Sequence, residues 1–195
     1  MKEEHTLTVY AENQVGLLNK ISIIFSRRKI NIESLNTSPS EIANIYRFTI
    51  VIHETAEVIK NLVRQIEKIV DVFKVYNNTN DEIIWQQMAL YKMPTAVIMK
   101  VVNVERLLRE FGAKAVVIRN DYTVFEATGQ KEEINNLLKE LTKYGLIEFV
   151  RSSRIAIIKS SEGVHKRVLN MEKNDPRKSP INNEFLSLKS KIFQM

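Results

Sequence analysis

Residues 5–28 read HTLTVYAENQVGLLNKISIIFSRR, and the spacing of apolar residues changes within this stretch. From His5 to Glu12 apolar and polar residues alternate, which predicts a strand with one buried face. From Gly16 to Arg28 apolar residues recur at helical spacing, which predicts an amphipathic helix. The stretch therefore predicts a strand that turns directly into a helix.

The same two patterns continue to residue 76. Two further strands are predicted at 31–37 and 44–53, separated by the turn signal Ser38-Pro39-Ser40-Glu41. A helix that begins after Thr55 carries an apolar 3-4 repeat as far as Val70, and a strand follows at 71–76. The first 76 residues thus have the predicted order β-α-β-β-α-β.

A polar break at 77–81 contains no apolar residue and predicts a domain boundary. The same order then recurs. Strands are predicted at 83–91, 114–119, 122–127, 147–151 and 155–159, and helices at 104–111 and 131–144. Helix and strand patterns compete at 95–102.

The predicted fold class is therefore α+β, with two tandem ferredoxin-like βαββαβ sandwiches. We expect residues 1–77 to form the first domain, 78–82 a linker and 83–163 the second domain. Residues 164–195 are expected to form a basic, flexible tail. This tail carries four of the six net positive charges, so the rest of the chain is nearly neutral.

Composition excludes several kinds of chemistry. The 195 residues include no Cys, which excludes disulfides, thiol nucleophiles and thiolate metal sites. The three His residues form no metal-ligand pattern, and no apolar run is long enough to cross a bilayer. No nucleophile motif, P-loop or dinucleotide fingerprint is present. We expect a cytoplasmic globular protein with no catalytic site, no metal and no cofactor of its own.

One group of residues has the composition of a ligand site. Asn13 and Gly16 lie at the turn where the first helix begins, and the free N–H groups of a helix start attract a carboxylate. Leu17 and Leu18 add apolar surface, and Asn31 and Ile32 begin the next predicted strand, from which Asn31 is expected to face the same region. An amino acid needs this mixture of donors, acceptors and apolar walls. Asn13 and Asn31 are also ordinary turn residues, so this alternative stays open.

The segments E-N-Q-V-G-L-L at 12–18 and N-I-E-S-L at 31–35 resemble the small, regulatory subunit of acetolactate synthase, also called acetohydroxyacid synthase. Further matching segments are D-V-F-K-V at 71–75, Y-T-V at 122–124 and F-V-R-S at 149–152. The resemblance covers residues 5–163. It implies that the first domain is an ACT domain.

The resemblance also implies a function. Members of this family bind a catalytic subunit, which holds thiamine diphosphate, Mg and FAD, activate it, and confer feedback inhibition by valine or by leucine or isoleucine. It implies a homodimer through the ACT domains, with the effector between them. By position, the effector would be lined by Asn13, Gly16, Leu17, Leu18, Asn31 and Ile32.

Besides an enzyme, this fold is compatible with two other functions. One is a stand-alone ACT protein that senses amino acids. The other is an RNA-binding module, for which Tyr46-Arg47-Phe48 offers aromatic residues two apart. That segment lacks the RNA-recognition pattern, and the body of the chain is nearly neutral. We therefore expect neither a nucleic-acid nor a membrane partner.

Overall fold

The computed structural model describes residues 1–40, 42, 44–160 and 166. These residues form two compact units. The first contains Met1–Ile84 and residues 157–160, and the second contains Trp85–Ala156. Each unit has a hydrophobic core of its own.

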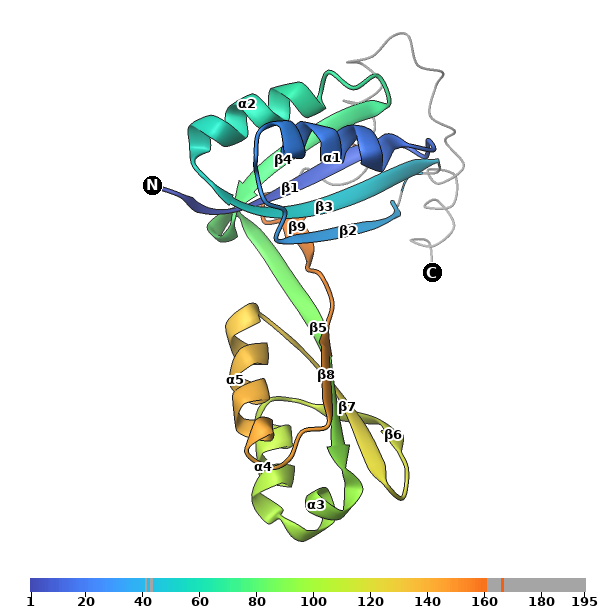
Figure 1. Ribbon diagram of the computed structural model, residues 1–195, viewed down its shortest axis with the longest axis vertical. Helices are drawn as coiled ribbons and strands as arrows, with labels where there is room; N and C mark the ends of the chain where they lie inside the picture. The colour runs from blue at the N-terminus through green and yellow to red at the C-terminus, as the bar shows by residue number, and fades with distance from the viewer. Residues whose placement is uncertain (41, 43, 161–165, 167–195) are drawn as a thin grey trace. The chain divides into compact units, whose positions relative to one another are not determined.

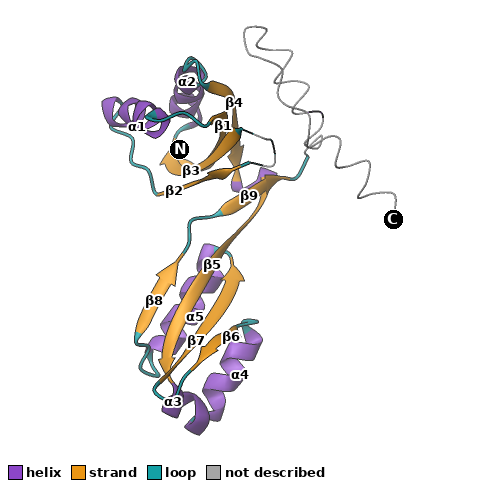
Figure 2. Ribbon diagram, turned by 90° about the vertical axis from the view of Figure 1, so that its right-hand side faces the viewer, coloured by secondary structure: helices purple, strands orange, loops and turns teal. Residues whose placement is uncertain are grey.

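The first unit has the predicted order of elements (Figure 1). They are β1 (Glu3–Glu12), α1 (Leu17–Arg27), β2 (Ser34–Pro39), β3 (Ile45–Glu54), α2 (Ala56–Ile66) and β4 (Val72–Thr79). The antiparallel sheet has the strand order β2-β3-β1-β4. Figure 2 shows both helices on one face of this sheet. This topology confirms the predicted ferredoxin-like fold of the first half.

Alternation along β1 explains how the first core forms. Leu7, Val9 and Ala11 point to the helix side and are fully buried. They meet Ile21 and Phe25 of α1, which recur at the helical period. Burying such apolar side chains against two helices supplies the main favourable energy of a domain of this size.

The second unit repeats this order after the 3-10 helix η1 (Asn80–Glu82). Its elements are β5 (Ile83–Pro94), α3 (Thr95–Lys100), α4 (Val102–Glu110), β6 (Lys114–Ile118), β7 (Tyr122–Gly129), α5 (Lys131–Thr142), β8 (Glu148–Arg151) and β9 (Ile155–Ile158). The strand order is β6-β7-β5-β8, and β9 also pairs with β5. The order of the first sheet thus recurs, which confirms the second predicted sandwich.

The structure corrects the bounds of the second predicted strand and shows which pattern holds at 95–102. The second strand begins at Ser34 and ends at Pro39 instead of covering 31–37, so Pro39 lies inside a strand that was predicted to end before it. Proline is tolerated there because β2 is an edge strand. At 95–102, where helix and strand patterns competed, the chain is helical from Thr95 to Lys100.

The expected division of the chain can be compared with these elements. The expected linker at 78–82 contains the end of β4 and the 3-10 helix η1. The second unit begins at Trp85, within β5, and the chain returns to the first unit at 157. The expected tail at 164–195 lies, apart from Lys166, outside the described residues. Within those residues, no helix combines the length and the apolar character needed to cross a membrane.

Candidate functional site

The turn between β1 and α1 is built by the backbone of residues 12–17. Gln14 N–H donates to the Glu12 carbonyl at 2.9 Å, and Leu17 N–H donates to the Gln14 carbonyl at 3.2 Å. Gly16 precedes the helix with φ of +85°, in the left-handed region where a side chain is strained. A Cβ on Gly16 would meet nothing within 4 Å, so its backbone lies open.

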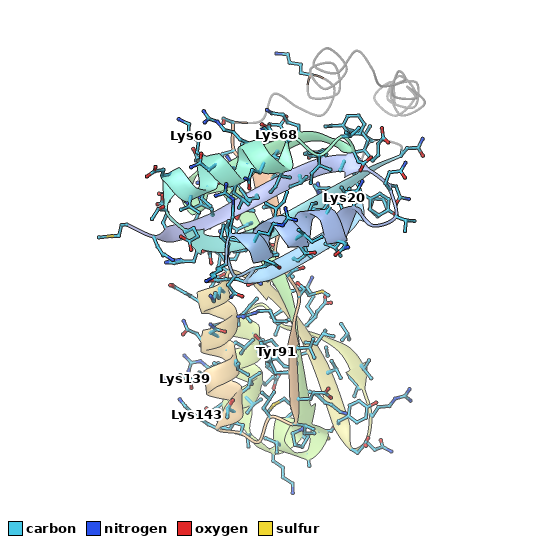
Figure 3. All side chains as sticks on the ribbon, turned by 45° about the horizontal axis from the view of Figure 1, so that its top comes forward. Lys20, Lys60, Lys68, Tyr91, Lys139 and Lys143 are labelled. Carbon is cyan, nitrogen blue, oxygen red and sulfur yellow. The ribbon has the colours of Figure 1, made fainter. Side chains whose placement is uncertain are left out.

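Neighbouring segments hold this turn in place. Glu12 N–H donates to the Asp71 carbonyl at 2.9 Å, and the Asp71 carboxylate accepts from Lys20 Nζ of α1 at 2.6 Å. Lys20 is labelled on α1 in Figure 3. Asn13 N–H donates to the Asn44 carbonyl at 3.3 Å. The end of β1 and the start of α1 are therefore fixed by the segments before β3 and β4.

The start of α1 is electrically distinct from the other helix starts. Among the described helices of nine or more residues, α1 alone has no acidic residue in its first turn. No side chain caps it, whereas Glu133 caps α5 by accepting from Gln130 N–H at 2.7 Å. Within the described residues, the first turn of α1 thus has neither an acidic residue nor a side-chain cap, which suits an external carboxylate at the positive end of the helix dipole.

Two exposed side chains provide the apolar surface next to this turn, and only one of them, Leu18, is among the predicted site residues. Leu18 is 43% exposed and Val15 is fully exposed, so both reach solvent beside Gly16. Leu17, predicted as a wall of the site, is buried in the core of the first unit instead. The sequence analysis does not include Val15, although an apolar residue within a polar turn is expected to have a solvent-exposed side chain.

Asn31 and Ile32 lie at the other end of α1. The eleven residues of α1 span about 16 Å and separate these two residues from Gly16. Glu33 N–H donates to the Val51 carbonyl, and Val51 lies opposite Thr6 of β1, six residues before Glu12. The prediction that Asn31 faces the same region as Asn13 is therefore wrong within one chain, because α1 carries the backbone across the sheet between them.

The turn has the chemistry of a binding site. Its exposed groups are backbone N–H donors, the amide of Asn13 and the apolar side chains of Val15 and Leu18. Two groups with displaced pKa values lie elsewhere. A hydrogen bond from Lys2 lowers the pKa of Glu54, and burial raises the pKa of Tyr91 to about 12. The described residues contain no group of three or more potential metal ligands.

A hollow in the second unit does not coincide with this turn. It has a volume of about 240 Å³, and its lining consists of Glu110 and Phe111 at the end of α4, Ala127 and Thr128 of β7, and Glu133, Ile134 and Leu137 of α5. Both carboxylates have partners, since Glu133 caps α5 and Glu110 accepts from Arg106 at 2.9 Å. Both carboxylates thus take part in contacts within their own helices.

Sequence comparisons cover both halves of the chain. The family model for the "AHAS small subunit-like ACT domain" matches residues 7–74, and the model for the "Small subunit of acetolactate synthase" matches residues 86–160. The acetolactate synthase small subunit of Bacillus subtilis (strain 168) is 32% identical over 163 residues, which cover 83% of this chain and 93% of the relative.

More distant relatives agree with this result. The small subunit of Mycolicibacterium smegmatis is 29% identical over 160 residues, covering 82% of this chain and 94% of the relative. The crystal structure of the acetolactate synthase small subunit from Thermotoga maritima matches with a TM-score of 0.73 and 22% identity. That match covers 82% of this chain and 99% of the other, and at this identity it shows a shared fold.

Proposed function

Since this chain belongs to the family of acetolactate synthase small subunits, we propose that it activates the catalytic subunit and makes it sensitive to valine or another branched-chain amino acid. The observation that carries the effector proposal is the start of α1. There Gly16 leaves the backbone open, and no acidic residue or side-chain cap occupies the first turn.

Each part of an amino acid has a counterpart at this turn. The carboxylate would accept hydrogen bonds from the N–H groups at the start of α1, where the helix dipole favours a negative charge. The amide oxygen of Asn13 would accept from the ammonium group. Val15 and Leu18, both exposed, would cover a branched apolar side chain.

A second copy of the chain would complete the site. Asn31 and Ile32 are separated from Gly16 by the length of α1, and one amino acid is too small to span this distance. If two first units pair around a twofold axis, the start of α1 in one copy can meet Asn31 and Ile32 of the other. The effector would then stabilise one arrangement of the pair.

Regulation follows from this arrangement. A ligand that binds one geometry of the paired chains more tightly shifts the population toward it, and the bound catalytic subunit responds. The chemistry belongs to that subunit, whose thiamine diphosphate, Mg and FAD would lie outside this chain. This chain would contribute binding and a change of geometry.

Two experiments test the proposal separately. Co-purification of the chain with the catalytic subunit from the same organism tests partner binding, and absence of a complex would contradict the regulatory role. Titration calorimetry of the chain with valine, leucine and isoleucine tests effector binding. No heat with any of the three would remove the sensing role and leave activation to be judged by the first experiment.

A mixing experiment tests whether two chains share the site. Asn13→Ala and Asn31→Ala variants should each bind valine weakly. In a mixed pair, one of the two sites contains both substitutions and the other contains neither, so mixing should restore binding in part. Failure of the mixture to exceed the separate variants would place both asparagines in one chain's own structure instead.

A further inference from the structure

Asp71 contacts both elements that flank the turn at Gly16. Its carbonyl accepts from Glu12 N–H at the end of β1, at 2.9 Å, and its carboxylate accepts from Lys20 Nζ at 2.6 Å. Lys20 is the fourth residue of α1, and its N–H donates to the Gly16 carbonyl at 3.0 Å. One residue from the connection between α2 and β4 therefore joins the strand and the helix on either side of the open backbone.

A β-bulge brings Asp71 to this point. The register between β1 and β4 shifts by one residue after Tyr10, so that Ala11 lies opposite Val72 and not opposite Phe73. The extra residue of β4 moves Asp71 one position along β1, to the level of the last residue of that strand. Bulges commonly re-aim side chains beside functional sites. Here the bulge aligns one residue with the start of the candidate site.

The ion pair between Lys20 and Asp71 is partly shielded from water. The Asp71 side chain is 18% exposed and the Lys20 side chain 54%. Attraction between charges is stronger where less water surrounds them. The pair also joins residues 51 positions apart in sequence. A pair within one helix, such as Arg106–Glu110, joins groups that the helix already holds together, so the Lys20–Asp71 pair constrains the chain more.

We propose that Lys20 and Asp71 are positioning residues for the effector, which hold the turn at 12–17 in its open shape without contacting the effector themselves. The inference rests on the proposed function, because it concerns that same site. A loop that is held in its binding shape loses less entropy when a ligand binds. Loss of the pair, of which Lys20 is labelled in Figure 3, should therefore weaken effector binding while the fold is retained.

The charges of the pair suit this position. Lys20 lies near the positive end of the α1 dipole, where a cation is unfavourable unless a negative charge accompanies it. Asp71 supplies that charge from outside the helix. The first turn of α1 itself contains no acidic residue, so no carboxylate within that turn competes with the effector for the helix N–H groups.

A second ion pair of the first unit provides a matched control. Lys74 Nζ lies 2.8 Å from Glu67 Oε1, and the two side chains are 43% and 32% exposed. This pair joins the end of α2 to β4, and Lys74 lies opposite Tyr10, before the turn begins. Its removal measures the general effect of losing an ion pair from this unit.

Valine titration of full-length variants tests the inference. Lys20→Met and Asp71→Asn remove one charge each at similar side-chain size, and each should weaken valine binding about two- to fivefold, the range for one ion pair. The double variant should lose no more than either single variant, because both substitutions break the same contact. Lys20→Arg, which keeps the charge, and Lys74→Met should bind valine as the native chain does.

Amide hydrogen exchange in the absence of valine gives a readout that does not depend on the effector. The N–H groups of Glu12 and Leu17 are both bonded at the turn. Their exchange should be faster in Lys20→Met and Asp71→Asn than in the native chain, because local opening of the turn becomes easier. In Lys74→Met their exchange should not change.

The outcomes separate this inference from the proposed function. Native valine affinity in both Lys20→Met and Asp71→Asn would overturn the inference, as would an equal loss in Lys74→Met. Additive losses in the double variant would also overturn it, since they would indicate two separate contacts with the effector. If the native chain binds valine but exchange at Glu12 and Leu17 is unchanged in the variants, only the inference fails. If the native chain binds none of the three amino acids, the proposed sensing role fails and the inference fails with it.

Discussion

The two units have the same order of elements but differ where the first strand of each leads into its first helix. In the first unit the turn at Gly16 has positive φ and an uncapped helix start. In the second unit Pro94 and Thr95 take this place, and Thr95 is fully engaged. Its N–H donates to the Asp121 carbonyl at 3.2 Å, and its hydroxyl donates to the Arg119 carbonyl at 2.7 Å. The first helix start is uncapped with open space at Gly16, whereas in the second unit carbonyl groups of the chain itself engage Thr95.

The outer faces of the two sheets differ as well. By register, Thr6, Thr8 and Thr49 share the outer face of the first sheet with Tyr10 and Val51, and all five side chains are buried. The second sheet carries Met88, Leu90 and Val150 at the matching kind of position. One fold has thus been used twice, with an uncapped helix start at the first turn of the first unit and exposed apolar side chains on the outer sheet face of the second.

The largest expected effect is a loss of stability in core variants, which tests whether the two units unfold independently. Leu62 and Leu137 are fully buried in the first and second cores. Changing either to Ala should lower the free energy of unfolding of its own unit by about 2–5 kcal/mol. Calorimetry should show Leu62→Ala shifting one transition and Leu137→Ala the other. A single transition that both variants shift equally would contradict the division into two units.

The next effect tests the open turn. Gly16→Asp should weaken valine binding at least about tenfold, equal to about 1.4 kcal/mol, because the new carboxylate competes for the helix N–H groups. Gly145 is the matched control, since its φ of +80° is close to the +85° of Gly16 and a Cβ at either position has open space. Gly145→Asp should lose a similar stability, about 1 kcal/mol, and keep its valine affinity in calorimetry.

Comparison of Gly16→Asp with Gly145→Asp distinguishes an effect on valine binding from an effect on folding. Activation of the catalytic subunit should remain in both glycine variants, because both are confined to single turns. Equal loss of valine affinity in Gly16→Asp and Gly145→Asp would assign the effect to general destabilisation. Loss of activation together with valine binding in Gly16→Asp would place Gly16 in assembly.

A smaller effect concerns the second core. The Tyr91 hydroxyl donates to the Ile134 carbonyl at 2.9 Å, and Tyr91→Phe should cost about 1 kcal/mol. Figure 3 labels this side chain. Burial raises the pKa of Tyr91 from 10.0 to about 12, so the folded chain keeps a proton that the unfolded chain loses above pH 10.

The pH dependence of stability follows from this shift. The contribution of Tyr91 is complete below pH 10 and is lost as the pH rises toward 12. Denaturant titrations at several pH values should show the stability of the native chain approaching that of Tyr91→Phe over this range. If the difference in unfolding free energy between the native chain and Tyr91→Phe stays constant from pH 9 to pH 12, the raised pKa of Tyr91 is contradicted.

The smallest effect compares two helix starts. Glu133 caps α5 by accepting from Gln130 N–H at 2.7 Å, and Glu133→Ala should cost about 0.5–1 kcal/mol. Valine affinity should not change, because α1 uses no such cap. Chemical denaturation and calorimetry measure the two quantities. A loss of valine binding would couple the hollow beside Glu133 to the effector site.

Sequence periodicity predicted most of the fold because each strand and helix has one strongly apolar face. The alternation at Leu7, Val9 and Ala11 and the helical repeat at Ile21 and Phe25 identify the core of the first unit correctly. The start of β2 was misplaced because its register is set by Val51 of a neighbouring strand, which local sequence does not contain.

The candidate site was predicted less completely. Gly16 and Asn13 are neighbours in sequence, so their turn could be identified from local pattern alone. The separation of Asn31 from that turn depends on the direction of α1 across the sheet. The apolar outer face was missed although β5 carries Ile84, Met88 and Leu90 between residues that point to the core. An apolar residue on both sides of a strand was the available signal.

The measurement that tests the account most directly is acetolactate formation by the catalytic subunit with and without this chain, in the presence and absence of valine. We expect the chain to raise the rate and valine to lower the raised rate, with Gly16→Asp retaining the first effect and losing most of the second. A rate that the chain does not change, or that valine lowers equally in Gly16→Asp, would contradict it.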